Sequence, residues 1–192
     1  MHEPGDELRG DRPLKPLLGK ARALRDAKSV TALLGELHRQ KIWALFDVSA
    51  EQDFKDATRY LTYLDQNGLG LPDRDYYVKD DEKSKELRGK YLPHLERTLV
   101  LAGTPKAQAK AAAEDVMSIE TELAKISKTR VQRRDPHGLY NPVTKTEIAA
   151  LSPLVGWDAY LKAVGLAGTE QLVITSKPFF EGTSKLIESV PM

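Results

Sequence analysis

The chain has 192 residues and no cysteine. This absence excludes both a disulfide framework and a metal site with cysteine ligands. It does not fix the cellular compartment, because many exported bacterial proteins also lack cysteine. An excess of one charge is missing as well: 29 lysines and arginines face 28 aspartates and glutamates, a formal net charge of +1. So balanced a chain has no overall field that would draw it to nucleic acid or to an anionic membrane.

Long hydrophobic runs are absent too. No run of about 18 apolar residues occurs, so no segment is expected to span a membrane. The first residues, Met1 to Glu7, are polar and acidic and do not form a signal peptide. If the protein is exported, we expect its signal upstream of them. What is present, 41% hydrophobic and 30% charged residues, is typical of a soluble globular protein with one domain, or one domain and part of a second.

Two helices are expected in the first forty residues. Apolar residues recur at helical spacing from Leu14 to Leu24. Ser29 is expected to cap the second helix, whose apolar face runs from Val30 to Leu37. The leucines of both helices are interpreted as core packing.

A short β-hairpin is expected next. Aromatic and β-branched residues favour strands at about 45–54 and 57–65. A helix over 50–60 is the competing interpretation, because apolar residues there also fit the helical period. Asn67-Gly68 then predicts a turn.

A helical hairpin follows. Leu87, Tyr91, Leu95 and Leu99 are spaced by four, and Gly103 stands where a helix commonly ends. Thr104-Pro105 is expected to start the second helix as its N-cap and first helical residue, and the helix extends to about residue 127.

The rest of the chain begins with an expected polar loop over 128–142, where we place a domain boundary. Thr144 and Glu147 form a capping-box pattern that opens a short helix. A helix over 157–164, an extended piece over 173–175 and a last helix after Pro178 complete the chain.

The sequence carries little that suggests chemistry. The four histidines, His2, His38, His94 and His137, are far apart, and neither His-Glu-x-x-His nor its inverted form is present. His2-Glu3 begins that pattern, but Asp6 occupies the place of the second histidine. No Gly-x-Ser-x-Gly elbow occurs.

Two further patterns have simple structural interpretations. Gly68 to Asp73 begins like a phosphate loop, but Pro72 and Asp73 spoil it, so we expect a turn feeding a helix capped by Asp73. The densest basic stretch is interpreted as cations near a helix C-terminus; it contains Lys125, Lys128, Arg130, Arg133 and Arg134.

The segment from Asp65 to Tyr77, DQNGLGLPDRDYY, is the most distinctive in the chain. It closely resembles the Gly-Leu-x-Leu-Pro-x-Arg-Asp-Tyr-Tyr block of the neprilysin and endothelin-converting-enzyme family of zinc metallopeptidases. The order of the surrounding segments fits the same family. Residues 46–56 resemble the strand region before the block, and 83–127 the helices after it. Residues 135–161 resemble the family's passage into its helical second domain, so the resemblance covers nearly the whole chain and is weakest before about residue 30.

The resemblance implies a large, two-lobed, mostly helical endopeptidase that acts on small peptides. In that family two histidines of His-Glu-x-x-His and a downstream glutamate hold zinc, the motif glutamate activates water, and the metal polarises the scissile carbonyl. An Asn-Ala-x-aromatic segment orients the substrate. None of these elements is present here, since Asn67 precedes Gly68 and Asn141 precedes Pro142. No catalytic, cofactor-binding or metal-ligating residue is therefore carried over, zinc is expected only in the parent enzyme, and the chain alone is expected to be inactive.

The expected fold is mainly α, a helical fragment with a short β-hairpin that spans parts of two lobes of a larger peptidase. Residues 1–130 are assigned to the N-terminal segment of the catalytic lobe and 131–192 to the start of the helical covering domain. The expected partners are the remaining catalytic lobe of the same polypeptide and, in the parent, peptide substrates, but neither nucleic acid nor a membrane span. The fragment is expected to help wall the chamber around the active site, with loop 128–142 as a hinge. Since the cysteine-free sequence resembles bacterial members, the parent is expected to be exported: periplasmic, secreted or membrane-anchored.

Two alternatives stay open. One is a free-standing helical module that binds a protein partner through an exposed apolar face, with Trp43, Trp157, Phe179 and Phe180 as anchors. The other is a nucleic-acid surface over residues 125–134.

Overall fold

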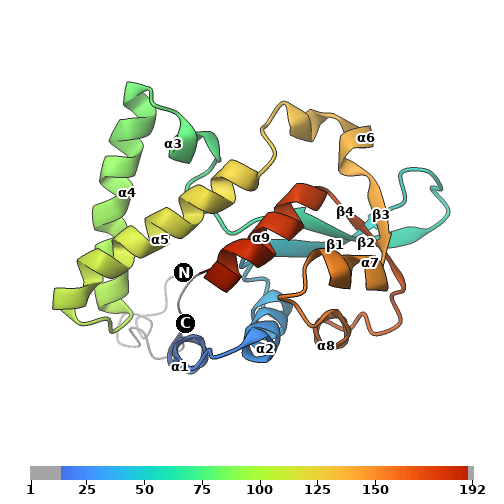
Figure 1. Cartoon of the computed structure of the whole chain (residues 1–192), viewed down its shortest axis with the longest axis horizontal. Coiled ribbons are helices and arrows are strands. Elements are labelled where there is room, and N and C mark those ends of the chain that lie inside the picture. Colours follow the sequence, from blue (N-terminus) through green and yellow to red (C-terminus); the bar gives the residue numbers. More distant parts are fainter. Residues whose placement is uncertain (1–13, 190–192) are drawn as a thin grey trace, which may run out of the picture.

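A computed structural model of the chain describes residues 14–189 (Figure 1). Helices predominate and accompany one four-stranded sheet. In chain order the elements are α1 (Lys15–Arg22), α2 (Ala27–Arg39), β1 (Phe46–Gln52), β2 (Tyr60–Gln66), α3 (Asp75–Val78), α4 (Glu82–Leu101), α5 (Lys106–Ile126), η2 (Gln132–Arg134), α6 (Pro136–Leu139), β3 (Asn141–Thr144), α7 (Lys145–Leu151), α8 (Trp157–Ala163), β4 (Gln171–Ile174) and α9 (Lys177–Ser189). The predicted mainly α class with a short β-hairpin is confirmed.

The sheet joins strands that are far apart in the chain. Its order is β1-β2-β4-β3. β1 and β2 form the predicted antiparallel hairpin, in which Phe46 pairs with Gln66 and Gln52 with Tyr60. β4 then pairs parallel to β2 and antiparallel to β3. The competing helix over 50–60 is thereby wrong, because residues 50–52 are extended and pair with residues 60–62 in this ladder.

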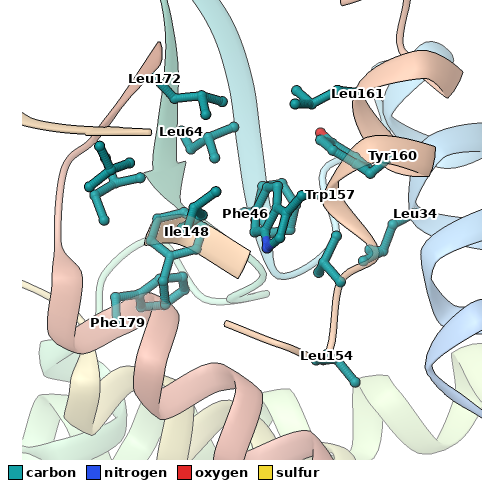
Figure 2. Packing of buried hydrophobic residues seen from close by; sticks show 14 of the residues in the cluster. Leu34, Phe46, Leu64, Ile148, Leu154, Trp157, Tyr160, Leu161, Leu172 and Phe179 are labelled. Atoms are coloured by element: carbon teal, nitrogen blue, oxygen red, sulfur yellow. The ribbon is translucent and has the colours of Figure 1, made fainter. Parts of the chain in front are cut away.

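One main hydrophobic core lies between the sheet and helices α2, α7, α8 and α9. Figure 2 shows Phe46 and Trp157 close together in this cluster, with Tyr160 and Leu161 on the α8 side. Ile148 and Phe179 fill the opposite side (Figure 2). The core thus forms where the apolar sides of several helices meet one face of the sheet.

The core and the sheet use residues from both sides of the predicted boundary at 130/131. Leu64 of β2 and Leu172 of β4 are both fully buried in it. The pairing of β2 with β4 also crosses the boundary, because Thr62 lies beside Leu172. The assignment of 1–130 and 131–192 to different lobes of a longer protein stays a prediction.

The helical hairpin α4–α5 extends away from the sheet (Figure 1). Its turn contains Gly103 with φ of +90°, as predicted for a glycine at the end of a helix. A second, smaller cluster of buried Leu71, Tyr77 and Ala124 lies under α3, beside this hairpin. No helix between residues 14 and 189 combines the length and hydropathy needed to cross a membrane.

The predicted caps of α2 and α5 are wrong. Asp26, not Ser29, is the N-cap of α2, because its carboxylate accepts from Ser29 N at 2.8 Å while Ser29 Oγ accepts from Asp26 N at 3.1 Å. Before α5, Pro105 has a ψ of 134°, an extended value, so the helix begins at Lys106 without a side-chain cap from Thr104. The capping box of Thr144 and Glu147 at α7 is confirmed.

The predicted polar loop over 128–142 is largely ordered into η2, α6 and the first residues of β3. Its polar side chains anchor it rather than leave it free. Arg133 binds Asp65 of β2, and Tyr140 Oη donates to Asp53 Oδ1 at 2.8 Å. These contacts tie the segment to both ends of the β1–β2 hairpin.

Candidate functional site

The distinctive block, residues 65–77, leads from the end of β2 into α3. At two of its positions glycine is present because a larger side chain would collide with neighbouring atoms. Gly68 has φ of +95°, and a Cβ there would lie 2.9 Å from the backbone nitrogen of Leu45. At Gly70 a Cβ would lie 1.9 Å from the Tyr91 hydroxyl oxygen. The block therefore needs glycine at both positions to pass close to its neighbours.

The carboxylate of Glu120 on α5 accepts hydrogen bonds from two tyrosine hydroxyls beside the block. Tyr77 Oη donates to Glu120 Oε2 at 2.7 Å, and Tyr91 Oη donates to Glu120 Oε1 at 3.1 Å. Burial, together with the neighbouring Glu120, raises the pKa of Tyr91 to about 12. Burial raises the pKa of Tyr77 as well. Both phenols therefore stay protonated and act as donors.

The charged residues of the block also bind internal groups. Arg74 Nε donates to the carbonyl oxygen of Ala124 at 2.7 Å, in the last turn of α5. Asp73 Oδ1 accepts from Asp75 N at 2.8 Å, at the start of α3, although the N-cap position is Arg74 rather than the predicted Asp73. Its other oxygen forms an ion pair with Arg130.

The end of β2 is held from two sides. Arg133 makes a bidentate pair with Asp65 at 2.9 and 2.6 Å, and Thr175 Oγ1 donates to the same carboxylate at 2.5 Å. The Gln66 amide accepts from Lys128 N at 2.7 Å and donates to Lys128 O at 3.2 Å. These contacts hold the segment that follows α5 against the end of β2.

A polar cavity of about 370 Å³ lies between the block and residues 127–133. Half-buried Asp47 lines it and accepts from Asn67 Nδ2 at 3.2 Å. Burial raises the pKa of Asp47 above its ordinary range. The cavity wall also carries the paired carboxylates of Asp65 and Asp73, so cations and anions alternate around it.

These groups do not form a zinc site. Between residues 14 and 189 no group of three or more histidine, cysteine, aspartate or glutamate side chains is arranged to hold a metal ion. The two carboxylates of the block that line the cavity, Asp65 and Asp73, each form an ion pair with an arginine. The contacts of residues 65–77, Glu120 and Arg133 link β2, α5 and η2, and we call this set of contacts the brace.

The histidines occupy unrelated places. His94 and His137 are exposed, whereas His38 is buried, with Nδ1 2.7 Å from Tyr160 Oη and Nε2 3.1 Å from Ala44 O. The prediction for His2 lies outside the described residues. Nothing in the sequence indicated the pair of His38 and Tyr160, because they are 122 positions apart.

The predicted basic stretch is partly neutralised. Lys125 pairs with Glu122, Arg130 with Asp73 and Arg133 with Asp65. These pairs favour a structural function for the stretch over a surface that binds polyanions.

One family model and several known proteins are similar to this chain. The sequence model of peptidase family M13 matches residues 1–192. Guinea-pig (Cavia porcellus) endothelin-converting enzyme 1 is 33% identical over 149 residues, which are 75% of this chain and 20% of that protein. Human endothelin-converting enzyme-like 1 is 30% identical over 153 residues, 77% of this chain and 20% of that protein.

Among solved structures, the zinc metalloprotease ZMP1 of Mycobacterium tuberculosis in its open state superposes with a TM-score of 0.88 at 29% identity. The match covers 96% of this chain and 29% of that one. PepO of Lactobacillus rhamnosus superposes with a TM-score of 0.73 at 14% identity, a likeness of fold. This chain therefore spans about a fifth of the length of the curated relatives that it matches.

Proposed function

The chain belongs to peptidase family M13, and on this premise we propose that it is the non-catalytic N-terminal part of a zinc metalloendopeptidase that hydrolyses small peptides. The observation that carries the proposal is the family match over all of residues 1–192. The curated relatives are about five times longer than the matched region, which leaves room for a zinc site elsewhere in the polypeptide. By itself the chain is inactive in this proposal, because it contains no His-Glu-x-x-His motif.

The part played by the chain is mechanical. The brace formed by residues 65–77, Glu120 and Arg133 holds the α4–α5 hairpin at a fixed angle to the sheet. A rigid wall of this kind would help enclose the chamber around the zinc site and limit the size of substrates.

The division into lobes is part of the proposal. Residues 1–130 would belong to the catalytic lobe and 131–192 to the start of the covering domain, with 128–142 between them as a hinge. A large movement at residue 130 would have to disturb the pairing of β2 with β4. Limited proteolysis tests the hinge: cleavage within 128–142 is expected despite the contacts of Arg133 and Tyr140, because a hinge has to release them. Sparing of this segment while other loops are cut would contradict the hinge.

The partners follow from the same proposal. The chain would pack against the remaining catalytic lobe of its own polypeptide, and the assembled enzyme would bind zinc and peptides. We also propose that the parent is exported, whether periplasmic, secreted or membrane-anchored. Fractionation of the source cells, with the peptidase followed by antibody, tests the compartment, and recovery only from the cytoplasm would contradict it.

The test of function is peptide cleavage with added zinc, in which this chain is compared with the full-length polypeptide. The expected result is cleavage by the full-length protein that a chelator abolishes, and no turnover by the chain alone. Zinc-dependent turnover by the chain would overturn its non-catalytic assignment. Absence of cleavage by the full-length protein would overturn the proposal of a peptidase.

The alternative, a free-standing module that binds partners through aromatic anchors, has less support. Trp157, Phe179 and Phe180 are at most 2% exposed and belong to the core. Only Trp43 of the four anchors is partly exposed. An interaction surface would therefore have to use other residues.

A further inference from the structure

Helices α2 and α8 pack unusually closely. A Cβ at Gly35 of α2 would lie 2.7 Å from the Cβ of Ala163 of α8, so the absence of a side chain at Gly35 sets the approach. At the other end of the contact, Gly156 N donates to Thr31 Oγ1 at 2.9 Å. The two helices are therefore in direct contact along their length, and they lie next to each other in Figure 1.

Two adjoining hollows of about 520 and 440 Å³ follow this contact on the outside of the molecule. We call them together the α2–α8 groove. They share two alanines, and apart from a few polar groups the larger hollow is lined by small apolar residues. The lining consists of Ala27, Lys28, Thr31, Ala32, Gly35, Glu36, Arg39, Gln40, Pro153, Gly156, Ala159 and Ala163.

The larger hollow of the groove is mostly apolar although it faces outward, whereas the smaller one also carries Glu36, Arg39 and Gln40. Ala32, Ala159 and Ala163 are all exposed. Ala159 and Ala163 are four residues apart, so they lie on one face of α8. The inward faces of the same helices already bury Leu34 and Tyr160 in the core. Helix α8 therefore carries apolar residues on two sides, and α2 adds Ala27 and Ala32 to the outer one. Apolar residues on two sides are typical of a helix with a neighbour on each side.

The rim of the groove is positively charged. Lys28 and Arg39 line it, and neither forms an ion pair within the described part of the chain. The acidic residue between them, Glu36, is paired with Lys20 of α1 at 2.6 Å. The unpaired charges that face an incoming partner are therefore cationic.

We infer that the α2–α8 groove receives one helix from the remaining part of the M13 polypeptide, with bulky aliphatic side chains on its inner face and aspartate or glutamate along its flank. This inference rests on the proposed function, because it takes the chain to be part of a longer peptidase. Large aliphatic side chains suit a floor made of alanine and glycine, where helices approach within about 8–10 Å of each other. Flanking carboxylates would meet Lys28 and Arg39 and set the direction of the helix.

The experiment is photo-crosslinking in the full-length polypeptide, with p-benzoyl-phenylalanine in place of Ala32 and the crosslinked peptides identified by mass spectrometry. The expected product joins residue 32 to a helix outside residues 1–192 that carries aliphatic residues and an acidic flank. The matched control places the same residue at Ala111, an exposed alanine of α5 that does not line the groove. It is expected to give no crosslink to that helix.

A crosslink confined to residues 1–192, a crosslink to a segment without an acidic flank, or none at all would overturn the inference. Zinc-dependent peptide cleavage measured on the same sample separates this failure from that of the proposed function. If cleavage is normal and the crosslink is missing, only the groove assignment fails.

A pair of charge variants gives a second readout. Next to an acidic helix, Ala159→Glu is expected to lower the melting temperature of the full-length protein by several degrees more than Ala159→Lys. In the isolated chain, where Ala159 is exposed in the same hollow as Lys28 and in the first turn of α8, Ala159→Glu is expected to melt no lower than Ala159→Lys. An equal effect of both variants in the full-length protein would contradict the acidic flank.

Discussion

The hydroxyl of Tyr77 links two parts of the chain that are 43 residues apart: it donates to Glu120 Oε2 at 2.7 Å while accepting from Leu71 N at 2.7 Å. Tyr77 is 4% exposed, so both bonds are shielded from water. One phenol thus fixes the block before α3 against the middle of α5.

Replacing Tyr77 by phenylalanine therefore tests the brace. Tyr77→Phe leaves the buried Leu71 N–H without an acceptor, and we expect the free energy of unfolding to fall by about 1–3 kcal/mol. Urea unfolding followed by circular dichroism measures it. The control Tyr60→Phe changes a side chain that is 72% exposed, so a change within about 0.5 kcal/mol is expected. Equal effects of the two variants would mean that the hydroxyl network adds nothing to stability.

Gly70 offers an independent test of the same region. Its Cβ position lies 1.9 Å from Tyr91 Oη and 2.8 Å from Tyr91 Cζ, so Gly70→Ala must displace the Tyr91 ring. We expect a loss of about 1–3 kcal/mol from overpacking. Gly89→Ala, in α4 with nothing within 4 Å of its Cβ position, is the matched control and should gain up to about 1 kcal/mol.

The double variant Gly70→Ala with Tyr91→Phe identifies the cause of this loss. Removing the hydroxyl takes away the closest atom, so the two changes together should cost less than the sum of the single ones. Strict additivity of the three unfolding energies would show that the clash with Tyr91 is not what destabilises Gly70→Ala.

Local patterns predicted the parts of the fold whose partners are close in sequence. The leucines of α4, the glycine turn at Gly103 and the capping box at Thr144 depend on residues within one or two turns. Strands β1 and β2 were predictable because a short loop connects them.

Long-range pairings were not predictable in this way. The parallel pairing of Thr62 with Leu172 connects positions 110 residues apart, and β3 and β4 have only four residues each. Such short strands gain their stability from the sheet that they join rather than from their own sequence. The internal contacts of the block could not be predicted from the sequence for the same reason. Arg74, for example, donates to the carbonyl oxygen of Ala124, which is 50 positions away.

Zinc binding by the isolated chain is a further test. We expect added zinc to leave its melting temperature unchanged, because residues 14–189 contain no cluster of three metal-ligating side chains. Differential scanning fluorimetry with and without a chelator measures this. A rise that the chelator reverses would contradict the expectation, and repeating the scan with His2→Ala would show whether the N-terminal histidine is responsible.

His38 makes the stability of the fold depend on pH. Because the carbonyl of Ala44 can only accept, Nε2 of His38 carries the proton and Nδ1 accepts from the Tyr160 hydroxyl. Burial lowers the pKa of His38 below its ordinary value of 6.5. Between the lowered pKa and 6.5 the unfolded chain therefore binds the proton and the folded chain does not, so the free energy of unfolding falls as the pH drops below 6.5.

Urea unfolding between about pH 5.5 and pH 8 measures this slope, which is at most about 1.4 kcal/mol per pH unit for one group. His38→Gln is expected to flatten it, whereas His94→Gln, at an exposed position, should keep it. The pKa of Asp47 is raised by burial, so its contribution has the opposite sign and grows as the pH falls. Measuring both histidine variants with Asp47→Asn removes that contribution. If the slope persists in His38→Gln, another group must be the one that binds the proton on unfolding.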